Sequence, residues 1–330
     1  MDYVRFGTTG MKVSKLALGC MTYGDPKWRE WVMDEEASMP FYKKAYEAGI
    51  TFWDTADMYS LGASETVTGK ALKKFAARRD EIVLATKVYN AMGPGANQKG
   101  LSRKHIMEGV DASLKRLGTD YIDLYIIHRL DQETRMEEAC EALNDLVRAG
   151  KVLYLGASSM YAWQFMKLLG IQRKHGFAPF VSMQNYYNLV YREEEREMMP
   201  LCASEGIAVT PWSPLARGYL AGSGLGKAAT NETTLRGRTD TVGAMLKVGN
   251  PQDEAIRRRV IKVAERLGVK PAVVANAWVL AKPFVTAPIV GASKPQHMDD
   301  AIAAMSVKLD ARTLKYLEEP YRPKAVVGHV

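Results

Sequence analysis

The 330-residue sequence predicts an α/β fold, a (β/α)8 TIM barrel with an N-terminal β-hairpin and a C-terminal helix. Three observations lead to this prediction. Short apolar runs alternate with helical stretches, several of these stretches end at a glycine, and the chain shows neither an internal repeat nor an obvious linker. Eight alternations favour a closed barrel over an open sheet, and residues 1–330 are predicted to form a single domain.

The strand predictions begin with the hairpin YVRFGTTGMKVSKL, which turns at Thr9-Gly10. Compact apolar runs with the length of buried parallel strands follow it. They span residues 16–19, 51–53, 82–86, 122–127, 152–157, 180–183, 207–212 and 286–290.

The stretches between these runs carry helical signals. They span residues 35–48, 65–74, 103–117, 135–149, 162–175, 193–205, 253–267 and 272–281, and a last helix is expected at 311–319. A glycine follows five of them, where a left-handed residue would end the helix. These are Gly49, Gly118, Gly150, Gly206 and Gly268.

The net charge of +8 and the pI of about 9.2 raise the question of nucleic-acid binding. The basic residues form short clusters on separate helices, such as Lys43-Lys44 and Arg257-Arg258-Arg259, and are interleaved with acidic clusters. This pattern is typical of solvated helix faces. We therefore expect no nucleic-acid partner, and the remaining positive potential suits a small anionic ligand.

The cysteines and the hydropathy of the sequence indicate where the protein is located. Cys20, Cys140 and Cys202 are odd in number, far apart and without a CxxC pair, so neither a disulfide framework nor a metal site is predicted. The N-terminus lacks a signal-peptide run, and no stretch of about 18 apolar residues is present. These features predict a soluble cytoplasmic protein without a membrane partner, and they leave its oligomeric state open.

Four polar residues stand at, or shortly after, the ends of predicted strands: Asp54, Tyr59, Lys87 and His128. A barrel brings such strand ends together around one mouth. A lysine ammonium beside a phenol favours the phenolate, so a tyrosine, a lysine, a carboxylate and an imidazole together can deliver a proton. Taken alone, each of these residues has a purely structural explanation: a structural ion pair, a packed aromatic side chain or a buried histidine with hydrogen-bond partners.

A nucleotide would have to be held by strand ends and loops. No GxGxxG motif follows the first strand, and the glycine-dense stretch at Gly222-Ser223-Gly224-Leu225-Gly226 has the wrong spacing. The longer segment 217–249 is unusually rich in glycine for a connection inside a barrel. We expect it to close over the cofactor as a lid, and the alternative is a flexible surface insertion.

Seven segments occur in an order that resembles the aldo-keto reductases: DTADMYS, LATKV, IIH, GASS, SMQNYYN, TPWSPLARG and APIVGASK. The resemblance covers nearly the whole chain. It implies a (β/α)8 barrel that reduces carbonyl groups with NADP(H). The PWSPLARG segment resembles most closely the bacterial subgroup whose barrel is shared with the potassium-channel β subunits.

The resemblance assigns roles that agree with the chemistry of the side chains. Tyr59 would protonate the oxygen of the reduced carbonyl, and Lys87 would make the phenol a better acid. Asp54 would orient Lys87, and His128 would donate a hydrogen bond to the carbonyl oxygen. The resulting activity is reduction of an aldehyde or ketone to an alcohol.

The same resemblance implies the cofactor residues. Gln184, Ser158 and Ser159 would meet the nicotinamide carboxamide, and Trp212 would stack on its ring. Ser213, Leu215 and Arg217 would meet the pyrophosphate. At the adenosine end, the implied residues are Gly291, Ser293, Lys294, His297 and Asp300.

The adenosine end also departs from the family pattern. Lys294 and Ser293, before a short helix, could bind the 2′-phosphate of NADP(H). The family often has Asn or Arg at Ser159, Gln or Arg at His297, and Asn at Ala301. These departures make NAD(H) an alternative cofactor.

The predicted substrate pocket consists of Tyr23, Trp28, Trp31, Tyr89 and Arg129. Its aromatic side chains suit aromatic or bulky alicyclic carbonyl compounds, although they could equally cover a hydrophobic rim. The sequence does not identify the physiological substrate.

Two other functions fit the same barrel. The first is a redox-sensing, NADP-binding β-like subunit, but those proteins carry Asn where this sequence has His128. The presence of the histidine favours an enzyme that turns over substrate. The second is a Schiff-base lyase with Lys87 as the reacting amine. Borohydride trapping on Lys87 would distinguish the lyase from a reductase.

Overall fold

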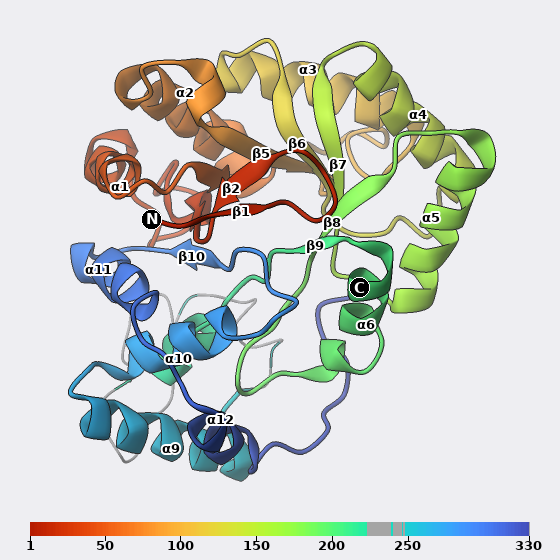
Figure 1. Cartoon of the computed structure of the whole chain (residues 1–330). Helices are drawn as coiled ribbons and strands as arrows, with labels where there is room; N and C mark the ends of the chain where they lie inside the picture. Colours follow the sequence, from red (N-terminus) through yellow and green to blue (C-terminus); the bar gives the residue numbers. More distant parts are fainter. Residues whose placement is uncertain (223–238, 240–245, 247, 330) are drawn as a thin grey trace.

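The computed structural model describes residues 1–329 except 223–238, 240–245 and 247. Parallel strands form the centre, and helices surround them (Figure 1). The strand order is β10-β3-β4-β5-β6-β7-β8-β9, so neighbours in the sequence are neighbours in the sheet. Their bounds are β3 (Ala17–Gly19), β4 (Phe52–Asp54), β5 (Val83–Val88), β6 (Ile122–Ile127), β7 (Val152–Ser158), β8 (Phe180–Gln184), β9 (Ala208–Val209) and β10 (Ile289–Gly291). The predicted α/β barrel is confirmed.

The barrel closes between its shortest strand, β9, and the segment that leads into β10. Thr286 N and Ile289 N each donate a hydrogen bond of 2.9 Å, to Val209 O and Pro211 O respectively. The predicted strand 207–212 is therefore longer than the observed one. Pro211 lacks the N–H group that a continuing ladder would need, and Trp212 forms only isolated bridges.

The N-terminal hairpin covers the end of the barrel at which the strands begin. It consists of β1 (Tyr3–Arg5) and β2 (Lys12–Ser14), paired antiparallel with Arg5 opposite Lys12. Phe6 and Val13 are fully buried and cluster with inward-facing barrel residues such as Phe52. Gly7 has φ +58°, and a Cβ there would lie 2.5 Å from Gly206 O, so this position requires glycine.

The helices follow the predicted alternation, with shifts of a few residues at their ends. They are α1 (Glu35–Glu47), α2 (Ala63–Phe75), α3 (Arg103–Leu117), α4 (Met136–Arg148), α5 (Ala162–His175), α6 (Met198–Glu205), α9 (Pro251–Leu267), α10 (Pro271–Leu280), α11 (Pro295–Ala304) and the C-terminal α12 (Ala311–Glu318). The five glycines predicted to end helices all have positive φ. Among the described residues, no helix is long and apolar enough to cross a membrane.

One predicted helix, 193–205, is divided in the structure. Its first residues form the 3-10 turn η4 (Glu193–Glu195), and only Met198–Glu205 is α-helical. The carboxylate of Glu193 accepts hydrogen bonds from Tyr321 Oη (2.6 Å) and Lys324 N (2.7 Å). These contacts with the C-terminal segment hold the turn away from a regular helix.

Candidate active site

A cavity of about 1230 Å³ opens at the ends of the strands opposite the hairpin. Polar side chains from β4, β7 and β8 and from the residues that follow β6 line one part of it, and the residues around β10 and the start of α11 line another. The carboxyl ends of barrel strands are where the active sites of this fold lie. The cavity therefore lies at the end of the barrel where the sequence predicts the site.

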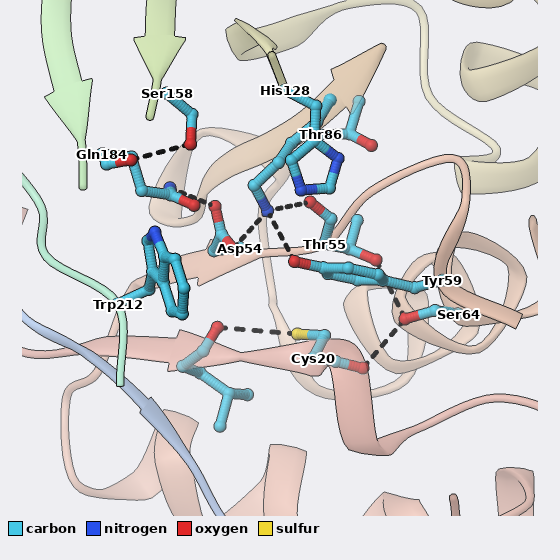
Figure 2. Close-up of polar contacts among 12 residues, drawn as sticks. Cys20, Asp54, Thr55, Tyr59, Ser64, Thr86, His128, Ser158, Gln184 and Trp212 are labelled. Carbon is cyan, nitrogen blue, oxygen red and sulfur yellow. Dashed lines mark hydrogen bonds and ion pairs between the residues drawn. The ribbon is translucent and has the colours of Figure 1, made fainter. Parts of the chain in front are cut away.

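A hydrogen-bonded group around Lys87, which β5 carries, lies against this part of the cavity. Figure 2 shows Asp54, Thr55 and Tyr59, the residues that Lys87 contacts, close to His128. Lys87 Nζ lies 2.6 Å from Asp54 Oδ1, 2.7 Å from Thr55 O and 3.3 Å from Tyr59 Oη. The lysine side chain is 0% exposed and lies behind the tyrosine. Asp54, Tyr59 and Lys87 are thus brought into direct contact.

The charges around Lys87 keep it an ammonium. Burial disfavours the charged form, but Asp54 and Tyr59 outweigh burial and raise the pKa of Lys87 above its ordinary value. Asp54 is itself fixed on both sides, because its second oxygen accepts a hydrogen bond of 2.9 Å from Gln184 Nε2. Ser158 Oγ donates to Gln184 O at 2.7 Å, which links β7 to β8 at the same point.

His128 follows β6 and faces Tyr59, with ring centroids 5.8 Å apart. Burial, together with the charges of Lys87 and Arg129, holds the pKa of His128 well below its ordinary value, so the ring is neutral at pH 7. Asn90 Nδ2 lies 3.1 Å from His128 Nδ1. An amide nitrogen can only donate, so Nδ1 is the accepting atom and the ring proton is on Nε2.

Asn90 is a site residue that the sequence reasoning missed. It lies in the loop after β5, three residues after Lys87, and lines the cavity. Its only signal in the sequence was its place just beyond a predicted strand.

The loops that carry these residues contain non-glycine residues with left-handed backbone. Ser60 and Leu61 have φ of 52° and 48°, Ser159 has 48°, and Ser213 and Arg217 have 55° and 59°. Such conformations cost energy and persist where the surrounding structure requires them, often at functional sites. These left-handed residues lie directly after Tyr59, directly after β7 and in the segment after Trp212. They are therefore found in several of the loops around the cavity.

The predicted nicotinamide residues lie together. Trp212 lines the cavity, and its Nε1 donates a hydrogen bond of 3.2 Å to Ser159 Oγ. The ring of Tyr186 packs on its other side at 4.7 Å. Ser159 is buried and is not among the cavity-lining residues, so it holds Trp212 from behind.

The residues predicted for the pyrophosphate and for the adenosine end also line the cavity: Ser213, Leu215, Arg217, Gly291, Ser293, Lys294, His297 and Asp300. Lys294 precedes α11, and Lys270, which was not predicted, precedes α10. Lys270 Nζ pairs with Asp300 Oδ1 at 2.8 Å, and Ser293 N donates to His297 Nδ1 at 3.3 Å. Two helix N-termini, each with a lysine, therefore border the same part of the cavity.

Comparison with known proteins identifies the chain. The model of the Aldo/keto reductase family matches residues 15–322. The chain belongs to this family. It is 47% identical over 345 residues to versiconal hemiacetal acetate reductase of Aspergillus parasiticus, covering 99% of this chain and 98% of the relative.

Further fungal relatives of this aldo/keto reductase share its full length. A protein of Schizosaccharomyces pombe described as "Putative aryl-alcohol dehydrogenase" is 44% identical, with 99% of this chain and 98% of the relative covered. A protein of Saccharomyces cerevisiae with the same description is 42% identical, with 97% of each covered. These relatives do not confirm the predicted subgroup related to the potassium-channel β subunits.

Three of the five predicted substrate residues line the cavity of this aldo/keto reductase: Trp31, Tyr89 and Arg129. Tyr23 does not. It is 0% exposed, packs against Phe41 and Tyr42, and donates a hydrogen bond of 3.0 Å to Ala292 O. Its side chain points into the packed region between β3 and α1, which the sequence could not indicate.

Trp28 is also absent from the cavity lining. It packs instead against the Arg29 guanidinium, 4.5 Å from the ring centroid, and against Trp31 at 6.2 Å. Trp28 thus supports the loop from its outer side, while Trp31 faces the cavity. The proposed lid, residues 217–249, lies for the most part outside the described residues.

Proposed function

We propose that this aldo/keto reductase reduces aldehydes or ketones to alcohols with NADPH, using Tyr59 as the proton donor. The observation that carries the proposal is the contact of Tyr59 Oη with the buried ammonium of Lys87, 3.3 Å away, beside a neutral His128. Membership of the family supports carbonyl reduction as the overall activity.

A nicotinamide cofactor, when bound, would supply the hydride for the carbonyl carbon, and the residues of the chain act on the carbonyl oxygen. His128 Nε2–H donates a hydrogen bond to the carbonyl oxygen and orients it. Tyr59 Oη then gives its proton to that oxygen as negative charge develops there. The ammonium of Lys87, fixed by Asp54, stabilises the phenolate that remains until a proton from solvent restores the phenol.

The residues present fit a nicotinamide dinucleotide. Gln184 uses its Nε2 on Asp54, which leaves its Oε1 to accept from the carboxamide, and Trp212 offers a ring face held by Ser159. At the other end, Lys294 and Lys270 stand before two helix N-termini, where anionic groups are favoured. This charge supports NADP(H) over NAD(H), which has no 2′-phosphate.

Aromatic carbonyl compounds are the substrate class that we infer for the cavity. Trp31 and Tyr89 line it, and aromatic side chains suit flat, apolar ligands. Two relatives carry the description aryl-alcohol dehydrogenase. Aryl aldehydes are therefore the first compounds to assay.

The environment of Lys87 weighs against the lyase alternative. A Schiff base requires a neutral, accessible amine, whereas Lys87 is 0% exposed, pairs with Asp54 and has a raised pKa. Reduction by this protein is tested by the loss of absorbance at 340 nm when NADPH is mixed with benzaldehyde. Absence of NADPH consumption across a panel of aryl aldehydes, with borohydride-trapped adduct on Lys87, would contradict the proposal.

A further inference from the structure

Arg129 brings a positive charge to the part of the cavity wall that holds Tyr59 and His128. It directly follows His128 and is half-buried in the cavity. Its Nη1 donates a hydrogen bond of 2.6 Å to the backbone oxygen of His128. Within the described parts of the chain, no carboxylate forms an ion pair with this guanidinium.

Two cations at the other end of the cavity have carboxylate partners. Lys270 pairs with Asp300 at 2.8 Å, and Arg257 pairs with Glu254 at 3.3 Å. Lys87 is neutralised by Asp54 and is fully buried. Next to the catalytic tyrosine and histidine, Arg129 therefore contributes a positive charge that the described residues do not balance with a carboxylate.

The guanidinium is placed to bind a second group of a substrate. Arg129 lines the same cavity as Tyr59 and Tyr89. Burial lowers the pKa of Arg129, but an arginine remains charged at neutral pH. A half-buried guanidinium binds an anionic oxygen through charge-assisted hydrogen bonds, which are stronger than neutral ones.

We propose that the preferred substrates are aromatic carbonyl compounds that carry an anionic oxygen on the same ring system, a carboxylate or an ionised phenol, bound by Arg129. This inference rests on the proposed carbonyl reduction. His128 positions the carbonyl oxygen, and the next residue of the chain holds the anion. A rigid ring that carries both groups spans the two positions, and Trp31 and Tyr89 provide the apolar wall for the ring.

Matched substrates test this inference with the wild-type protein and NADPH. The 2-, 3- and 4-carboxybenzaldehydes are each compared with their methyl esters, and the hydroxybenzaldehydes with their methoxy analogues above the pKa of the phenol. We expect kcat/KM of the best anionic isomer to exceed that of its neutral partner by about tenfold or more. The two series show whether the carboxylate or the ionised phenol is preferred.

Substitution of Arg129 locates the effect. Arg129→Met should reduce the ratio of kcat/KM for acid over ester by about tenfold, and Arg129→Lys should reduce it less. Arg135→Met removes the same charge from an exposed position on the same loop and should preserve the ratio. A structural role of Arg129 would instead lower both rates equally.

The outcomes separate the two proposals. If esters and acids are reduced equally well by the wild type, or if Arg129→Met leaves the ratio unchanged, the anion site is contradicted while carbonyl reduction stands. If no aldehyde of either series consumes NADPH, the proposed function itself fails. The wild-type comparison decides even if Arg129→Met does not fold.

Discussion

Asn90 Nδ2 lies 3.1 Å from His128 Nδ1, and this contact determines which nitrogen of the imidazole carries the proton. With Nδ1 accepting, Nε2–H is the donor available to a substrate. The residue that contacts Nδ1 of this histidine thus follows a different strand than the histidine does.

The first prediction concerns this contact. Asn90→Ala should lower kcat by about tenfold or more, because the ring loses the donor that selects its tautomer and orientation. The measurement is steady-state reduction of benzaldehyde together with the imidazole ¹⁵N chemical shifts of His128. Asn90→Asp is the matched comparison, since a carboxylate accepts from Nδ1 and favours the opposite tautomer. Unchanged kcat and ¹⁵N shifts in Asn90→Ala would contradict the assignment.

The second prediction concerns the proton donor. Tyr59→Phe should lower kcat by about a hundredfold or more, because it removes the acid and leaves the cofactor wall intact. NADPH binding, measured by fluorescence titration, should change little. Tyr46→Phe, which removes a hydroxyl bonded to Glu81 at 2.8 Å, is the control and should retain activity. Near-wild-type turnover in Tyr59→Phe would exclude this residue as the acid.

The third prediction concerns Lys87. Lys87→Met should cause a loss of kcat comparable to that of Tyr59→Phe, since the phenolate loses its ammonium and Asp54 loses its partner. Because a buried carboxylate left without its cation is costly, the variant should also unfold at a lower temperature. The double variant Asp54→Asn/Lys87→Met tests whether the unpaired carboxylate causes this loss of stability. It should unfold at a higher temperature than Lys87→Met alone. Retained activity in Lys87→Met would remove the lysine from the mechanism.

The fourth prediction concerns cofactor choice. Lys294→Ala should weaken NADPH binding by about tenfold and change NADH binding little, because only NADPH carries the 2′-phosphate. The measurement is the Kd of each cofactor for the wild type and the variant, obtained by fluorescence titration. Lys262→Ala, an exposed lysine on α9 outside the cavity lining, is the charge-matched control. Equal losses for the two cofactors would show that Lys294 does not recognise the 2′-phosphate.

The fifth prediction concerns Asp57, a buried carboxyl behind the site. Its Oδ2 has no hydrogen-bond partner among the described residues, while Oδ1 accepts from Met58 N at 2.6 Å. Burial, and then the charge of Glu65, raise the pKa of Asp57 well above its ordinary value. In the folded protein this carboxyl therefore keeps its proton to higher pH than in the unfolded chain.

The sign of the pH dependence follows from this shift. As pH rises above the unfolded pKa of about 3.9, the unfolded chain loses the proton first, and Asp57 makes the protein progressively less stable up to its folded pKa. Asp57→Asn should therefore raise Tm more at pH 7 than at pH 4.5. Asp120→Asn, at an exposed position, should show no such trend. An equal effect of Asp57→Asn at both pH values would contradict the raised pKa.

Local patterns in the sequence were sufficient for the barrel, and the resemblance to the aldo-keto reductases supplied most candidate site residues. Apolar runs of strand length, glycines with positive φ after helices and polar residues at strand ends all depend on neighbours in the chain. For this reason the strand Ile122–Ile127 and the helices Arg103–Leu117 and Ala162–His175 agree with prediction residue by residue. Closure of a barrel then brings Asp54, Lys87 and His128 together.

The tertiary structure alone decided the direction of each side chain and the partners it meets. Tyr23 and Trp28 were predicted to line the substrate pocket, but Tyr23 packs in the core against Phe41, and Trp28 packs against Trp31 outside the cavity lining. The contacts of Asn90 with His128 and of Lys270 with Asp300 leave no local signal, because they join residues 38 and 30 positions apart. Such contacts form only when separate strand–helix units close into one barrel. In the closed barrel, the environment of a side chain depends on residues that are distant in the sequence.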